Sequence, residues 1–345
     1  MHSLRLLLCV VGLAAAAAGG LDAQPARDAS PRADFLKLID RPRVPLAPEA
    51  GAPVPEGKLV RIDFSYQTEA GQRVPGILIE PAAAAGRRAA VIALHGTGGK
   101  KENELWLLRE LAQLGFVAVA IDGRYHGARA PGGKGDYAAA ILRAYRTGRE
   151  HPFFFDSVWD VMRLVDWLQT RSDVDPARLG LIGISKGGIE TYLTAAVDPR
   201  IAVAVPCIAV ESFRWADEHD SWHSRIGTIQ GAFDQAARDA GVAHPDGAFV
   251  HAFYERVAPG IDGEFDGPLM VPLIAPRPLL TINGDSDPRT PRPGLDECLA
   301  VVASAYRAAG AEDRFAMLLQ PQTGHKVTEA GYARAKAWFV RWLRP

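Results

Sequence analysis

The sequence has little that would tie it to nucleic acid or to a membrane surface. Its 345 residues carry a formal net charge of −1, and no block of like charges forms an interaction tail. Such a chain has no long-range attraction to nucleic acid or to an anionic membrane. We therefore expect a small-molecule partner and no nucleic acid. Nothing in the sequence indicates an oligomeric state.

Cysteine is also scarce, with only Cys9, Cys207 and Cys298 in the chain. Cys207 lies in a strand-like run and Cys298 in a helix-like run. Because cysteine is often a small core residue, we expect these two to be buried free thiols. No C-x-x-C pair is present, which excludes a disulfide scaffold and a cysteine metal site of that spacing.

Long apolar runs are few, and the clearest stands at the N-terminus. Arg5 precedes the apolar stretch from Leu6 to Ala18, and small residues follow it, which is the pattern of a secretory signal peptide. The stretch is too short to span a bilayer comfortably, and no second run of spanning length follows. We expect residues 1–23 to be a signal peptide, the mature protein to be exported to the periplasm or secreted, and no stable membrane insertion.

The remaining chain divides into an arm and one domain. Residues 24–57 are rich in Pro, Ala and Arg with little periodicity, which predicts a poorly ordered arm. Residues 58–345 form the domain. Alternating apolar residues over 58–66 and 74–80 predict an antiparallel hairpin at a sheet edge.

Strand-like and helix-like patterns then alternate to the end of the chain. Continuous apolar runs are typical of strands buried on both faces of a parallel sheet, and we expect them over 89–94, 116–121, 179–184, 201–210, 278–282 and 314–319. Helical spacing predicts helices over 105–115, 158–168, 189–197, 295–308 and 330–343. The sequence therefore predicts an α/β domain with a mostly parallel sheet of about eight strands and helices on both faces.

Residues 211–270 interrupt this alternation between the sixth and seventh strands. The segment is too long for a simple connection and is rich in aromatic residues. We expect a helical cap over the carboxyl ends of the strands. Trp222 and Phe253 are the first candidates for substrate contacts; the alternative is that the aromatic rings only pack the insertion onto the domain.

The motif that carries chemistry is Gly183-Ile184-Ser185-Lys186-Gly187, a G-x-S-x-G sequence between a predicted strand and a predicted helix. This pattern is typical of a nucleophile elbow, a strained turn that exposes a serine hydroxyl. A serine needs a base that is oriented by a carboxylate. Downstream, Asp285 and Asp287 follow one predicted strand and His325 follows the next, so all these residues are expected at carboxyl ends of strands.

The motif, the strand pattern and the chain order Ser, Asp, His together resemble the α/β-hydrolase superfamily. The stretch 174–180 that leads into the motif is similar to the dienelactone hydrolase, acetyl xylan esterase and prolyl oligopeptidase-like branch. The resemblance covers essentially the whole domain. It implies an α/β-hydrolase fold and a carboxylic ester hydrolase that acts on a small-molecule ester through an acyl-enzyme, without a cofactor.

The resemblance also implies roles for particular residues. Ser185 is the expected nucleophile and His325 the general base. The family places the aspartate three residues after a glycine and shortly before a proline, which selects Asp287 and leaves Asp285 as a turn residue. The expected oxyanion hole is made by the backbone N–H groups of Lys186 and Thr97, with Gly98 as the alternative to Thr97.

Other readings of the same residues remain. A prolyl oligopeptidase-like peptidase, an acyl-thioesterase and a catalytically silent binding protein on the same fold are all compatible with these motifs. His219 and His223 are spaced i, i+4, but the H-E-x-x-H pattern is not met and we expect no metal. We expect Asp156, Asp160 and Asp166 to lie at the start and on the solvated face of their helix.

Overall fold

The computed structural model describes residues 30–83 and 86–345. The predicted signal peptide lies outside the described residues. Twelve α-helices and ten strands are present in the described part of the chain. The strands are β1 (Glu49–Ala50), β2 (Val54–Glu56), β3 (Leu59–Glu69), β4 (Gln72–Pro81), β5 (Arg88–Leu94), β6 (Val117–Ile121), β7 (Val174–Ile184), β8 (Ile201–Cys207), β9 (Leu279–Gly284) and β10 (Phe315–Gln320).

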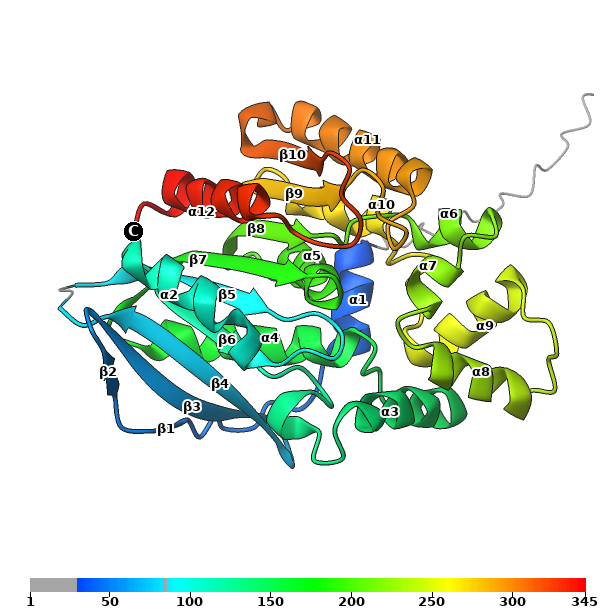
Figure 1. The fold of residues 1–345 in the computed structure, drawn as a ribbon, viewed down its shortest axis with the longest axis horizontal. Helices are drawn as coiled ribbons and strands as arrows, with labels where there is room; N and C mark the ends of the chain where they lie inside the picture. Colours follow the sequence, from blue (N-terminus) through cyan, green and yellow to red (C-terminus); the bar gives the residue numbers. More distant parts are fainter. Residues whose placement is uncertain (1–29, 84–85) are drawn as a thin grey trace, which may run out of the picture.

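One mixed sheet organises the molecule (Figure 1). Its order is β1-β3-β4-β6-β5-β7-β8-β9-β10, with β2 paired to β3 at the edge. The pairs from β6 to β10 are parallel, and the hairpin β3–β4 is antiparallel, as the alternating pattern predicts. The two short strands β1 and β2 bring the sheet to ten strands rather than about eight.

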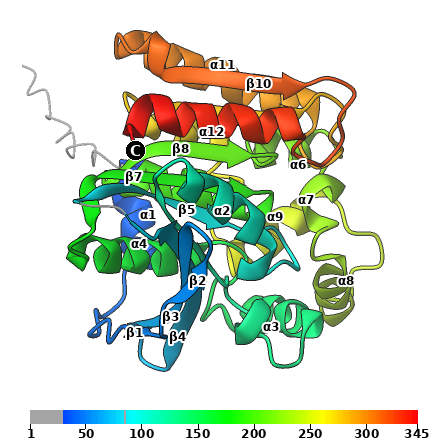
Figure 2. The same cartoon turned by 60° about the vertical axis from the view of Figure 1, so that its left-hand side comes forward.

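Helices cover both faces of the sheet. They are α1 (Pro31–Ile39), α2 (Leu105–Gln113), α3 (Lys134–Thr147), α4 (Phe155–Thr170), α5 (Lys186–Val197), α6 (Phe213–Glu218), α7 (His223–Ile226), α8 (Gln230–Asp239), α9 (Gly247–Val257), α10 (Gly267–Met270), α11 (Arg292–Ala308) and α12 (Glu329–Leu343). α2 and α12 pack on one face, and α1, α4 and α5 lie on the other (Figure 2). Both faces need a covering layer because both are apolar. Successive side chains of a strand point to opposite faces, and alternate residues of β5 belong to two separate apolar cores.

The N-terminal segment corrects one expectation. Residues from 30 onward of the predicted poorly ordered arm are folded: Phe35 of α1 is fully buried and packs edge-on against Phe155 and Phe265, at centroid distances of 4.8 and 5.1 Å. Arg32 donates hydrogen bonds to the carbonyl oxygens of Ala196 and Leu273, both at 2.8 Å. Composition alone indicated an arm, but two apolar residues one turn apart, Phe35 and Ile39, give the helix a face that can be buried.

The insertion 211–270 holds α6 to α10. α8 and α9 contact α3, and these three helices lie beyond the carboxyl ends of the parallel strands (Figure 1). Helix α3 has no counterpart in the predicted elements. Its buried positions Tyr137, Ala140, Ile141 and Ala144 do follow helical spacing, but three of them are small or polar and give a weak apolar signal.

Candidate active site

Ser185 lies on the turn between β7 and α5. Its φ of 55° and ψ of −114° place a non-glycine residue in a rarely populated region, so the turn is strained. The Ser185 N–H donates to the carbonyl oxygen of Cys207 on the neighbouring strand at 2.9 Å, and this bond holds the turn in place. The turn therefore has the geometry of a nucleophile elbow.

Gly183 and Gly187 of the motif lie so close to neighbouring backbone atoms that no side chain would fit at either position. A Cβ on Gly183 would lie 2.0 Å from the carbonyl oxygen of Gly187. A Cβ on Gly187 would lie 2.4 Å from the carbonyl oxygen of Leu94. Backbone atoms at these distances cannot move aside cheaply, so the strand, the turn and the following helix can meet here only through glycine.

His325 bridges Ser185 and Asp287. Its Nε2 atom lies 2.8 Å from Ser185 Oγ, and its Nδ1 atom lies 2.8 and 3.0 Å from the two carboxylate oxygens of Asp287. Because a carboxylate can only accept, Nδ1 carries the hydrogen and Nε2 is left to accept from the serine hydroxyl. Burial by itself raises the pKa of Asp287, but the hydrogen bond and charge of His325 outweigh it and lower that pKa below its ordinary value.

Asp285 has a different environment. Its carboxylate accepts from the backbone N–H groups of Gln322 and Thr323, at 2.9 and 3.1 Å, in the loop that carries His325. The structure therefore brings Asp287 to the histidine and leaves Asp285 as a turn residue. It also shows a function that the sequence did not suggest, since Asp285 ties the loop of Asp287 to the loop of His325.

The loop after β5 runs directly beside the serine. A Cβ on Gly96 would lie 3.2 Å from the carbonyl oxygen of Ile184 and 3.6 Å from Ser185 Cβ. Among hydrogen bonds within the described chain, none has the backbone N–H of Thr97 or of Lys186 as donor. The N–H of Lys186 belongs to the first turn of α5, where helix geometry leaves it without a partner. Both groups are thus available beside Ser185.

His95 fixes the shape of this loop. Its Nδ1 donates to the carbonyl oxygen of Gly96 at 2.8 Å, and its Nε2 accepts from the N–H of Gly123 at 3.0 Å. Burial, helped by the nearby charge of Lys186, lowers the pKa of His95 to about 4. A neutral imidazole with one donor and one acceptor matches these two backbone partners, so His95 joins the loop after β5 to the loop after β6.

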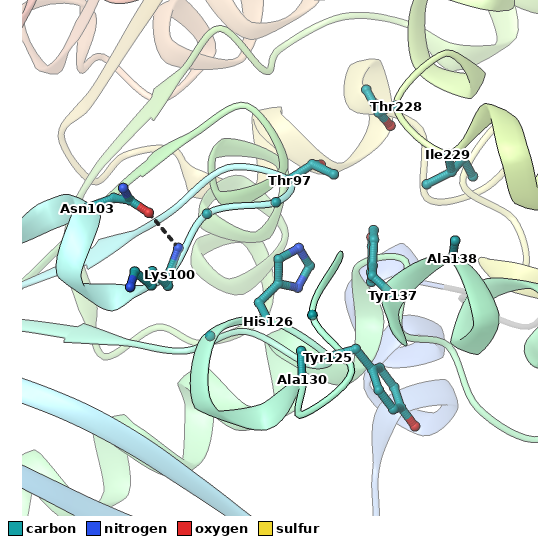
Figure 3. Close-up of a pocket in the computed structure, with 14 residues that line it drawn as sticks. Thr97, Lys100, Asn103, Tyr125, His126, Ala130, Tyr137, Ala138, Thr228 and Ile229 are labelled. Carbon is teal, nitrogen blue, oxygen red and sulfur yellow. Dashed lines mark hydrogen bonds between the residues drawn. The ribbon is translucent and has the colours of Figure 1, made fainter. Parts of the chain in front are cut away.

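Two cavities lie next to each other, and one of them is lined by Ser185. One, of about 570 Å³, is lined by Ser185, His325 and Tyr332 among others. The second, of about 560 Å³, is lined by the loop after β5, the loop after β6 and α3 (Figure 3). Thr97 and Thr228 line both. The sequence analysis did not single out Thr228 or the α3 residue Tyr137.

Trp222 and Phe253 are not on the walls of these cavities. Trp222 is 5% exposed and Phe253 is fully buried. Both rings pack against Phe233, at centroid distances of 5.5 and 5.2 Å. The expectation that Trp222 and Phe253 contact the substrate is thus corrected. The two rings pack in the core of the insertion, which is the alternative that the sequence left open.

Two of the three helix aspartates are also corrected. Asp156 lies in the first turn of α4, as expected, but both Asp156 and Asp160 are only 1% exposed rather than solvated. Asp156 pairs with Arg41 of the N-terminal segment. Asp160 binds Arg124 through two hydrogen bonds of 2.8 and 3.0 Å. Burial raises the pKa of Asp160, but the charges of Arg124 and of Arg129, which also pairs with this carboxylate, outweigh it and hold that pKa well below its ordinary value.

The other sequence signals have structural explanations. His219 and His223 do not share a helix, because α6 ends at Glu218 and α7 begins at His223. Cys207 and Cys298 are free and buried, as predicted. No helix in residues 30–83 or 86–345 is both long and apolar enough to cross a membrane.

Fold and site define the class of protein. Solved structures with the same fold include the acetyl xylan esterase from Paenibacillus sp. R4, with a TM-score of 0.67, 20% identity, and coverage of 90% of this chain and 93% of that one. The fold is therefore the α/β-hydrolase fold.

Sequence comparison narrows the class. The acetyl xylan esterase family model matches residues 55–213. YtaP of Bacillus subtilis (strain 168), a protein named as a hydrolase, is 28% identical over 286 residues, which cover 79% of this chain and 84% of YtaP. The 4-O-methyl-glucuronoyl methylesterase of Podospora anserina is 29% identical over 161 residues, or 46% of this chain and 32% of that protein. These similarities identify the chain as a carboxylic ester hydrolase, and its similarity to the acetyl xylan esterase family covers residues 55–213.

Proposed function

We propose that the protein cleaves carboxylic esters with Ser185 as nucleophile, His325 as general base and acid, and Asp287 as the group that orients His325. The observation that carries the proposal is the chain of hydrogen bonds from Ser185 through His325 to Asp287 on a strained strand-to-helix turn. The similarity to esterases supports it.

The steps follow from this geometry. Ser185 Oγ attacks the ester carbonyl while its proton passes to His325 Nε2. The backbone N–H groups of Lys186 and Thr97 stabilise the negative charge on the carbonyl oxygen. When the carbon–oxygen bond to the leaving group breaks, His325 Nε2 gives its proton to the departing alkoxide oxygen, and an acyl group remains on Ser185. Water then attacks the acyl carbon while His325 Nε2 takes a proton from it. The bond to Ser185 Oγ breaks, the proton returns from His325 to Ser185 Oγ, and the carboxylic acid leaves.

A fluorophosphonate probe tests the nucleophile. Intact-mass analysis of the wild-type protein is expected to show one adduct, which peptide mapping places on Ser185. Ser185→Ala is expected to show none and to lose hydrolysis of p-nitrophenyl acetate. A wild-type protein without an adduct, or an adduct that survives Ser185→Ala, contradicts the proposal.

We also propose that the protein is exported after removal of residues 1–23 and acts on a small-molecule ester. Expression of the full chain in a Gram-negative host, followed by intact-mass analysis of the periplasmic fraction, tests the first part. The expected product lacks about 23 residues. A full-length protein that stays in the cytoplasm argues against export.

A further inference from the structure

Arg289 places a positive charge on the wall of the cavity at Ser185. Its backbone N–H donates to Asp287 Oδ1 at 2.8 Å, so it belongs to the loop that carries this aspartate. Its side chain lines the same cavity of about 570 Å³ as Ser185 and His325. Cavities of this size hold one small molecule. A group bound at the Arg289 guanidinium and an ester group bound at Ser185 can therefore belong to the same substrate.

The insertion holds this guanidinium in place. Arg289 Nη1 donates to the carbonyl oxygen of Ser224 at 3.0 Å and, at 3.4 Å, to that of His223. The end of α7 leaves room for it, because a Cβ on Gly227 would lie 2.2 Å from Nη1. Carbonyl oxygens are neutral acceptors, so they orient the side chain without cancelling its charge. The guanidinium is thus fixed in position and still cationic.

The other side of the guanidinium is available to a ligand. Within residues 30–83 and 86–345, Arg289 Nε and Nη2 donate to no protein acceptor, and the side chain forms no ion pair. Arg289 is partly exposed, and neither nitrogen is closed off from solvent. The more deeply buried Arg124 and Arg225 each have a carboxylate partner. A ligand can therefore reach the two donors that the protein leaves unused.

The charge of the cavity wall decides which ligand fits. Besides His325, the charged residues that line the cavity are Arg289 and Lys326, and no aspartate or glutamate of the described chain lines it. Positive groups without a nearby carboxylate attract anions. Nε and Nη2 of an arginine lie in one plane and match the two oxygens of a carboxylate. The cavity wall thus fits a carboxylate.

We propose that Arg289 binds a free carboxylate of the substrate, so that the enzyme prefers esters that carry a carboxylate in addition to the ester group it cleaves. Arg289 is then a specificity-determining residue. The insertion contributes to specificity because its backbone orients this guanidinium, whereas its buried aromatic rings do not contact the cavity. This inference rests on the proposed function, since it requires an ester cleaved at Ser185.

Two matched pairs of esters test the proposal. p-Acetoxybenzoate carries its carboxylate on the leaving group, and the p-nitrophenyl monoester of adipic acid carries it on the acyl group. The neutral partner of each is its methyl ester. Release of acetate in the first pair and of p-nitrophenol in the second gives kcat/KM. The ratio of kcat/KM for the anionic ester to that for the neutral ester is compared between proteins, so the intrinsic reactivity of each ester cancels.

Arg289→Met is expected to lower this ratio by about tenfold or more in at least one pair, because the carboxylate loses a charged partner with two donors. Lys326→Met is the matched control, since it removes one positive charge from the same cavity wall. Lys326 is exposed, so solvent screens its charge, and its substitution is expected to change the ratio by less than about threefold.

Gly227→Ala tests the position of the guanidinium. The variant keeps every charge, but its Cβ must displace Arg289 Nη1, so the ratio is expected to fall by about threefold or more in the same pair. Thermal unfolding of each variant checks folding. If Arg289→Met does not fold, Arg289→Gln takes its place, because it removes the charge and keeps an amide donor for the Ser224 carbonyl oxygen.

The outcomes separate this proposal from the proposed function. A ratio that loss of the Arg289 charge leaves unchanged in both pairs overturns the carboxylate site. An equal reduction by Lys326→Met also overturns it, because general charge attraction would then be enough, and an unchanged ratio in Gly227→Ala contradicts the proposed position. In all these cases the wild type would keep its fluorophosphonate adduct on Ser185. A wild type with no adduct and no hydrolysis of any ester would instead reject the nucleophile.

Discussion

Lys186 and Glu190 form a buried ion pair one turn apart on α5, immediately after the nucleophile. The two side chains are 1% and 3% exposed, and Lys186 Nζ donates to Glu190 Oε1. The sequence motif drew attention to the backbone N–H of Lys186. The structure adds that its ammonium group lies in the interior, where a charge without its partner is costly.

The first prediction concerns this ion pair. Glu190→Leu is expected to reduce the free energy of unfolding by about 3–5 kcal/mol, because it leaves the Lys186 ammonium buried without a counterion. The double variant Lys186→Met/Glu190→Leu is expected to recover much of that loss, since it removes both charges. Urea denaturation of the two single variants and the double variant measures the coupling. Additive effects of the two substitutions would argue against a paired charge.

A second prediction separates the two aspartates. Asp287→Asn is expected to lower kcat by about 10⁴-fold, because an amide can donate to His325 and favour the wrong tautomer. Asp285→Asn is expected to lower kcat by less than about tenfold, since it only weakens the hydrogen bonds to Gln322 and Thr323. Steady-state kinetics on p-nitrophenyl acetate compares them. Similar losses in both variants would show that the roles are not divided in this way.

The third prediction concerns pH and Glu104, which is 6% exposed just before α2. Burial raises the pKa of Glu104 from 4.5 to about 7. Between these values the unfolded chain releases a proton that the folded protein keeps, so stability falls as pH rises, by up to about 3 kcal/mol. Glu104→Gln removes this contribution.

The measurement is the free energy of unfolding at pH 5 and pH 8. The quantity compared is the free energy of unfolding of Glu104→Gln minus that of the wild type. This difference is expected to be more favourable to the variant at pH 8 than at pH 5. The same stability difference between the two proteins at both pH values would mean that Glu104 does not retain its proton in the folded state.

A fourth prediction follows from the core of the insertion. Phe253→Ala is expected to destabilise the protein by about 3–5 kcal/mol, because it leaves a cavity beside Phe233. Its relative rates among esters are expected to match those of the wild type. Thermal unfolding and an ester panel measured below the melting temperature test both parts. Altered ester selectivity with unchanged stability would restore Phe253 as a substrate contact.

Much of the sheet could be predicted because its signals are local. Buried parallel strands are continuous apolar runs, and β5, β6, β9 and β10 match the predicted runs to within two residues, whereas β7 begins five residues earlier than predicted and β8 ends three residues earlier. The motif around Ser185 was recognisable for a related reason: Gly183 and Gly187 are needed for contacts within a few residues or with the adjacent strand. Asp287 and His325 followed from their positions after strands and from the family resemblance.

Other features depend on partners distant in the sequence. Asp156 and Asp160 have the pattern of a solvated helix face, and only Arg41, Arg124 and Arg129 make their burial possible. Phe35 lies in a segment whose Pro-, Ala- and Arg-rich composition predicts an arm, and its burial depends on Phe155 and Phe265, which pack against it. No local pattern contains the residues that neutralise or cover these side chains.

The division between sequence and structure is thus physical. Short-range patterning of apolar residues and glycines was enough for the α/β fold, the serine turn and the chain order of its partners. Which rings pack in the insertion, which arginines neutralise Asp156 and Asp160, and how His126 comes to pack against Tyr137 depend on contacts between segments far apart in the chain. Those contacts exist only when the sheet, α3 and the insertion have assembled.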